Sequence, residues 1–172
     1  MLYDCLADLD LKVDGHDTEL RERDTSSGFT RTTTVVSLHG DGHTGRGEDV
    51  TYDSDPHYAL ADRGTDLPLT GTYQFAAFAG HLDSIDLLFG DEPGQSIFRS
   101  YRRWAVESAA LDLALRQAGT DLASQLERGY APVRFLVSTR LEEPPTGERV
   151  LDWLDRNPRL EFKLDPTPEW PP

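Results

Sequence analysis

The chain of 172 residues is long enough for one domain with a hydrophobic core, or for a small domain joined to part of another. Its 31 acidic and 17 basic residues give a net charge of −14, which disfavours binding to nucleic acid or to an anionic membrane surface. With one cysteine, Cys5, and no apolar run near the roughly 20 residues of a membrane helix, we expect a cytoplasmic protein without disulfides.

The first forty or so residues predict the beginning of an antiparallel sheet. Residues 3–13 alternate between apolar and charged side chains, which predicts a half-buried strand. Its inward face would carry Tyr3, Cys5, Ala7, Leu9, Leu11 and Val13. Residues 16–24 would continue in extended form, and a turn at 26–28 would lead to a second strand over the β-branched segment 29–39.

A third strand is predicted over residues 43–52, because Gly40-Asp41-Gly42 is typical of a tight hairpin turn. The product would be a three-stranded antiparallel meander. Residues 40–45, GDGHTG, also fit the letters of the dinucleotide-binding pattern, but that site needs a helix directly after the glycines. The residues that follow have the pattern of a strand and not of a helix, so we interpret the glycines of residues 40–45 as turn residues.

Helices are predicted after the meander. Short ones are expected at 56–62 and from about Thr72, and a long one over 97–119. Ser96 could cap the long helix, and Gly119 stands where helices commonly end in the left-handed conformation. This helix is apolar on most sides, which predicts a core position. Its polar exceptions are Arg102, Arg103, Glu107, Asp112 and Arg116.

The last forty residues have a different pattern. A short helical piece at 121–129 precedes a buried strand at 132–138, an amphipathic helix at 146–157 and another strand at 159–166. Strand, helix and strand within so short a segment predict a βαβ unit with parallel strands.

Several residues near the meander are of types that bind metal ions, but each has a plainer explanation. His39 and His43 are four residues apart, but a hairpin turn separates them, so the spacing has no helical meaning. The segment from Asp53 to Asp55 resembles the start of a calcium loop without its later Gly and Glu. We therefore predict no metal ligand in the chain. Cys5 is interpreted as a small buried hydrophobic residue.

Lys163 is the main candidate for chemistry. The chain draws its positive charge almost entirely from arginine, yet this lysine lies near the carboxyl end of the last predicted strand, where parallel-sheet folds place reactive groups. Arginine stays protonated, whereas a buried lysine can move protons. Glu161 and Asp165 share its face of the strand. The plainer alternative is an edge-strand lysine that reaches into solvent.

Together these segments resemble the N-terminal part of an enolase-superfamily protein of the mandelate racemase and muconate-lactonizing type. Gly45-Arg46-Gly47-Glu48 matches the family's G-x-G-E at the third strand. The helix from Trp104 resembles the family's A-x-x-x-A-L-W-D segment, with Leu113 near the Trp site, and RLEFKLDP at 159–166 resembles the second barrel strand with its acid/base lysine.

The resemblance implies an α+β fold. Residues 1–130 would be the capping domain, a three-stranded meander with helices, and residues 131–172 the start of a (β/α)₈ barrel. Such proteins remove a proton α to a carboxylate, with a divalent metal, usually Mg²⁺, stabilising the enolate. The segments 24–29 and 49–58 resemble the two capping loops that close over the substrate. Lys163 would be the acid/base residue, with Glu161 and Asp165 as candidate substrate-binding residues.

Two departures from the family pattern limit this expectation. The family's Lys-x-Lys is here Glu161-Phe162-Lys163-Leu164-Asp165, so Lys163 matches either the second lysine, with Glu161 replacing the first, or the first, with Asp165 replacing the second. The family's Mg²⁺ ligands would lie on later strands, beyond this chain.

The sequence consequently leaves two functional classes open. One is a fragment of a metal-dependent dehydratase, racemase or cycloisomerase acting on a small carboxylate, inactive by itself. The other is a non-catalytic binding or oligomerisation module that reuses the cap fold. We favour the fragment, and we expect its uncovered strand edges to promote homo-oligomers or partial disorder beyond residue 131.

Overall fold

The computed structural model divides the chain into two compact units. One unit comprises residues 1–23 and 30–130, and the other residues 24–29 and 131–172. The residues that the structure describes are 2–25, 28–64, 66–141 and 145–165. The chain as a whole is α+β, as predicted.

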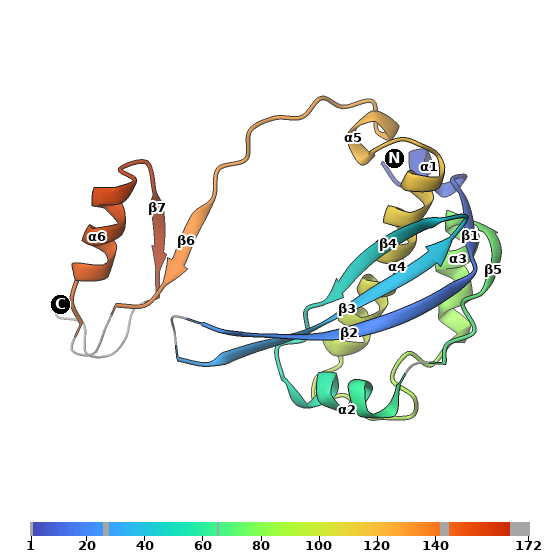
Figure 1. The fold of residues 1–172 in the computed structure, drawn as a ribbon, viewed down its shortest axis with the longest axis horizontal. Coiled ribbons are helices and arrows are strands. Elements are labelled where there is room, and N and C mark those ends of the chain that lie inside the picture. The colour runs from blue at the N-terminus through green and yellow to red at the C-terminus, as the bar shows by residue number, and fades with distance from the viewer. Residues whose placement is uncertain (1, 26–27, 65, 142–144, 166–172) are drawn as a thin grey trace. The chain divides into compact units, whose positions relative to one another are not determined.

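The sheet of the first unit has the strand order β2–β3–β4 (Figure 1). These strands are β2 Gly15–Asp24, β3 Thr30–Gly40 and β4 His43–Asp49. β3 and β4 are antiparallel, from Thr34 opposite Asp49 to Gly40 opposite His43. Between them Asp41 and Gly42 both have positive φ, which is the conformation of a two-residue hairpin turn. The predicted three-stranded antiparallel sheet is confirmed, although Ser26 and Ser27 of the predicted 26–28 turn lie outside the described residues.

The prediction of one strand over residues 3–13 is wrong in its first half. Residues Asp4–Ala7 form a short helix, α1, and only Asp10–Val13 form a strand, β1. The helix turns Leu6 onto the core and leaves Cys5 exposed, so the buried position expected for this cysteine is also wrong. The alternating pattern is obeyed from Leu9 onward, where Leu9, Leu11 and Val13 are buried.

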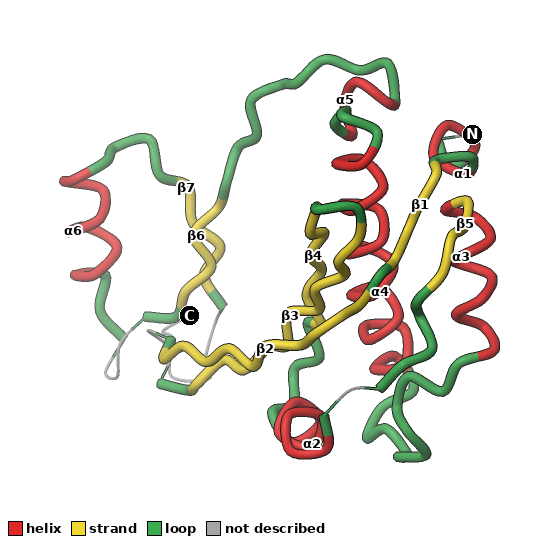
Figure 2. Tube along the Cα trace, turned by 45° about the vertical axis from the view of Figure 1, so that its right-hand side comes forward, coloured by secondary structure: helices red, strands yellow, loops and turns green. Residues whose placement is uncertain are grey.

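β1 is not part of the meander. It pairs antiparallel with β5, Gly71–Gln74, in a separate two-stranded sheet (Figure 2). The helix expected from Thr72 therefore begins later, as α3 Phe75–His81. Pairing with β1 explains this correction, because it satisfies backbone groups of residues 71–74 that would otherwise enter the helix.

The long helix α4, Ile97–Gln117, is the centre of the first unit's core. It lies across β4 and β3 on one face of the sheet (Figure 1). Gly119 has φ +63° and follows the end of the helix as predicted, whereas the Ser96 side chain does not cap its start. Side chains added at Gly45 and Gly47 would meet the backbone of α4 at Ala109, Leu113 and Ala105, so the absence of Cβ atoms on β4 lets strand and helix approach closely.

Shorter helices complete the first unit. They are α2 Asp55–Arg63, the 3₁₀ helix η1 Leu82–Ser84 and α5 Leu122–Gln125. The Asp121 carboxylate accepts a 2.8 Å hydrogen bond from the Ser124 amide at the start of α5, and this bond lowers the pKa of Asp121. α2 and α5 lie within the segments 56–62 and 121–129 that the sequence pattern assigns to helices, apart from one residue at each end of α2.

The second unit is a strand, a helix and a strand. β6 Leu136–Thr139 and β7 Glu161–Leu164 are parallel, with Ser138 opposite Lys163, and α6 Glu148–Arg156 connects them. The parallel βαβ arrangement agrees with the prediction. The first strand, however, begins at Leu136 and not at residue 132, and the burial expected for it is wrong, because Phe135 is 81% and Leu136 57% exposed. The ring of Phe162 stacks on that of Trp153, with centroids 6.0 Å apart, so this face of β7 packs on α6.

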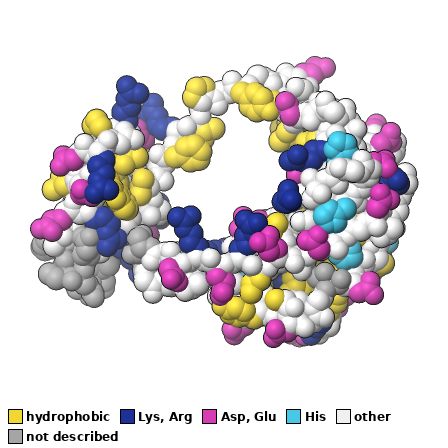
Figure 3. All heavy atoms as spheres, viewed as in Figure 1, with side chains coloured by type: hydrophobic (Ala, Val, Ile, Leu, Met, Phe, Trp, Pro, Cys, Tyr) yellow, Lys and Arg dark blue, Asp and Glu magenta, His cyan; other side chains and the backbone are white. Residues whose placement is uncertain are grey.

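Charged side chains are spread over the surface of the first unit rather than gathered at one place, on the face that Figure 3 shows. Among the described residues, no helix is both long enough and apolar enough to cross a membrane.

Candidate functional site

Lys163 lies on the face of β7 that is turned away from α6. Phe162 stacks on Trp153 of α6, and because side chains alternate along a strand, Lys163 points to the opposite side. The Lys163 side chain is 62% exposed. The structure thus presents this amine at an open face of a parallel strand pair.

The two acidic neighbours of Lys163 have different partners. Lys163 Nζ donates a 2.7 Å hydrogen bond to Asp165 Oδ1, and this bond, together with the lysine charge, lowers the pKa of Asp165. Glu161 Oε1 accepts a hydrogen bond from Arg134 Nη1 at 3.1 Å. Of the two candidate substrate-binding residues, Asp165 is therefore the one in direct contact with the candidate acid/base lysine.

A buried ion pair anchors the 49–58 segment of the first unit. Asp49 is fully buried at the end of β4, and Arg102, with a side chain 6% exposed, reaches it from α4. Arg102 Nε donates to Asp49 Oδ2, while Asp49 Oδ1 accepts from the Thr51 amide at 2.9 Å and from the Thr51 hydroxyl at 2.7 Å. Both charges are thus compensated where water is excluded.

His57 adds a second buried link to the same segment. It is fully buried in α2, with Nδ1 2.8 Å from the Thr34 hydroxyl and Nε2 2.9 Å from the Thr51 carbonyl oxygen. A carbonyl can only accept, so Nε2 carries a hydrogen. On the exposed side, Arg31 donates to the carbonyls of Val50, Thr51 and Tyr52. The 49–58 segment, which is expected to be a capping loop, is therefore fixed by the contacts of Asp49, His57 and Arg31.

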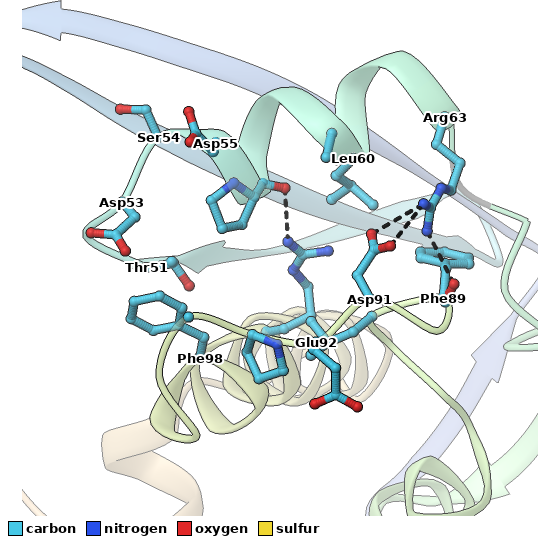
Figure 4. A pocket seen from close by; sticks show the side chains of 16 residues that line it. Thr51, Asp53, Ser54, Asp55, Leu60, Arg63, Phe89, Asp91, Glu92 and Phe98 are labelled. Carbon is cyan, nitrogen blue, oxygen red and sulfur yellow. Dashed lines mark hydrogen bonds and ion pairs between the residues drawn. The ribbon is translucent and has the colours of Figure 1, made fainter.

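A cavity of about 590 Å³ opens between this segment and the residues that lead into α4 (Figure 4). Leu60 points into it from α2, and Phe98 lines it from the start of α4. Arg63 donates a 3.1 Å hydrogen bond to Asp91 and lies over the Phe89 ring, 5.6 Å from its centroid. Other lining residues are Thr51, Asp53, Ser54, Asp55, Pro56, Ala59, Leu88, Glu92, Pro93, Gly94 and Arg102.

His39, one of the two histidines considered as metal ligands, has other partners: it contacts Asp17 Oδ2 at 2.5 Å and Thr44 Oγ1 at 3.0 Å on the sheet. Within the described parts of the chain, no group of three or more His, Cys, Asp or Glu side chains is placed to hold a metal ion.

Sequence reasoning missed the Asp49–Arg102 pair. The signal was present, because Arg102 is a charged residue within a helix that is apolar on most sides. A charge in such a position needs a carboxylate partner. The identity of that partner, 53 residues earlier in the chain, could not be read from local spacing.

The fold and its candidate site define an α+β protein with a helix-covered antiparallel sheet, followed by a parallel βαβ segment that bears an exposed lysine. Comparison with family models assigns the chain to a family. Residues 4–125 match the N-terminal domain, and residues 129–172 the C-terminal domain, of a family described as a domain of unknown function, DUF8230. The chain belongs to this family. No curated protein matches it.

Proposed function

We propose that the chain supplies the capping domain and the first two barrel strands of an enolase-superfamily protein, which removes a proton α to a carboxylate. Lys163 would be the acid/base group, and the 49–58 segment would close over a small carboxylate substrate. A cytoplasmic location is part of this proposal. The observation that carries it is the position of Lys163 on a parallel strand, on the face opposite the packing helix α6. In a (β/α)₈ barrel that face is the interior.

Two further features support the proposal. The long helix α4 packs directly on the glycines of the GRGED strand, which is the segment that resembles the family's G-x-G-E. The 49–58 segment is fixed at both ends of its loop by Asp49 and His57, as a specificity loop on a rigid scaffold requires.

The proposed roles of Lys163 and Asp165 follow from the chemistry of their side chains. Lys163 would accept the α-proton at Nζ once its hydrogen bond to Asp165 has opened and its ammonium group has given one proton to solvent. Asp165 would hold the ammonium form until substrate arrives. Mg²⁺, when bound, stabilises the enolate in such enzymes. The described residues contain no group of three or more His, Cys, Asp or Glu side chains that could hold it.

The test is exchange of the α-proton for deuterium in D₂O with Mg²⁺, followed by NMR over a panel of small carboxylates. It compares this chain with the polypeptide encoded by its continuous reading frame. We expect exchange only where later strands supply carboxylate ligands, and a loss of about a hundredfold or more in Lys163→Met. Lys12→Met is the matched control, since Lys12 is the other lysine of the chain and lies exposed on β1.

Two results would refute the proposal. One is exchange that survives Lys163→Met. The other is the absence of exchange together with a self-associating chain, which would favour the binding or oligomerisation module.

A further inference from the structure

We propose that the cavity between the 49–58 segment and the start of α4 binds an organic cation, an ammonium or guanidinium group on an apolar body. This proposal does not rest on the enolase resemblance, because the charge required is opposite to that of a carboxylate substrate. All lining residues belong to the first unit.

The size and walls of the cavity suit a small molecule. Its volume of about 590 Å³ lies within the range of ligand sites, roughly 300–1,000 Å³. Its walls combine apolar and charged side chains, and Leu88, Phe89 and Pro93 are the half-buried apolar residues among them. The apolar wall residues are Pro56, Ala59, Leu60, Leu88, Phe89, Pro93 and Phe98.

The two arginines of the cavity are already neutralised. Arg63 binds Asp91 and the Phe89 carbonyl, and Arg102 binds Asp49 and, at 3.4 Å, the Pro56 carbonyl. An anionic ligand would have to break these pairs, one of which is buried. The cavity therefore disfavours anions.

The remaining charges favour a cation. Four carboxylates line the cavity. Asp91 pairs with Arg63, and Glu92 with Arg99 at 3.5 Å, so Asp53 and Asp55 are the lining carboxylates that make no ion pair within the described residues. In Figure 4, Asp53 stands on the loop before α2 and Asp55 at the first position of α2, both at the edge of the cavity, while Leu60 points inward. A ligand with a positive end and an apolar body would place its charge at this edge and its body against Leu88 and Phe89, which are half-buried lining residues.

Binding is tested on the 172-residue chain by NMR titration with 2-phenylethylammonium at about 0.1 M salt. 2-Phenylethanol and 3-phenylpropionate are the neutral and anionic probes of similar shape. We expect saturable amide shifts within residues 51–63 and 88–98 for the ammonium probe, and weaker or no shifts for the other two. A blocked peptide with one lysine tests whether the cation can come from a protein chain instead of a small molecule.

Three variants separate a specific site from attraction to an acidic protein. Asp53→Asn with Asp55→Asn should weaken ammonium binding about fivefold. The matched pair Asp8→Asn with Asp10→Asn removes the same charge from exposed positions at the N-terminal end and should leave binding unchanged. Ala59→Trp should fill the cavity from an exposed helix position and abolish binding.

Either of two results would overturn the proposal. Equal shifts from the charged, neutral and anionic probes would show that charge does not select the ligand. Equal weakening by both asparagine pairs would show general electrostatic attraction only.

Discussion

Replacing either member of the Asp49–Arg102 pair should destabilise the first unit strongly. In Asp49→Asn the side chain keeps its shape and can still accept hydrogen bonds from Thr51, but the charge beside Arg102 is lost. In Arg102→Met the aliphatic stem remains and the Asp49 carboxylate loses its cation. Each variant leaves one buried charge without its partner.

The expected magnitude follows from burial. Asp49 is fully buried and the Arg102 side chain is 6% exposed, so solvent screens little of the interaction. Breaking a buried pair by removing one partner costs about 3–5 kcal/mol. We expect about 3 kcal/mol for each variant, a large part of the 5–15 kcal/mol typical of a domain. The double variant should lose about 2 kcal/mol less than the sum, because it leaves no unpaired charge.

Urea unfolding measures these losses. Trp104 reports on the first unit when Trp153 and Trp170 are replaced by Phe, which also preserves the aromatic contact with Phe162. With a slope of about 2 kcal/mol/M, each single variant should lower the midpoint by about 1.5 M.

The control for this experiment is Glu19→Gln. Glu19 pairs with Arg21 on the exposed strand β2, and its loss should not move the midpoint. A coupling energy below about 0.5 kcal/mol between Asp49 and Arg102 would refute the reasoning.

Three other outcomes are expected. Gly47→Ala should cost about 2–3 kcal/mol in the same urea assay, because its methyl group would collide with the Ala105 carbonyl, whereas Gly129→Ala, which has open space, should cost none. Lys163→Met should raise the pKa of Asp165 towards its ordinary value, as measured by ¹³C NMR titration, because the variant lacks the hydrogen bond that lowers this pKa. In the native chain the ion pair persists above the lowered pKa and is lost as the pH falls through it. An Asp165 pKa that is the same in both proteins would show that the pair does not form in solution. Cys5 should react with a maleimide in the folded chain, and protection until urea unfolds the protein would contradict its exposed position.

The elements that could be predicted from the sequence are those with strong local patterns. α4 has no Pro or Gly across 21 residues and ends before Gly119, and the parallel pair β6 and β7 follows from two apolar strands around an amphipathic helix. The β3–β4 hairpin follows from the Asp41-Gly42 turn. In each of these cases, the residues that determine the structure lie within one continuous segment of the sequence.

The N-terminal error shows where that information ends. Tyr3, Cys5 and Ala7 continue the alternation of the later strand, but Leu6 finds a place on the core only if residues 4–7 turn as a helix. Pairing of β1 with residues 71–74 then converts the expected start of a helix into a strand. Both outcomes depend on partners about 60 residues away, and tertiary contacts of this kind override local pattern.

The candidate sites divide in the same way. Lys163 and Asp165 are two residues apart on one strand, so alternation alone brings them together, and their 2.7 Å contact needs no other part of the fold. The Asp49–Arg102 pair joins the end of β4 to α4, and the cavity beside it is lined by the segments 51–63 and 88–102, which are far apart in the sequence. A charged residue within an apolar helix predicts that an oppositely charged partner lies beside it in the fold. Its location, and the ligand site that its pairing leaves beside it, are properties of the packed domain.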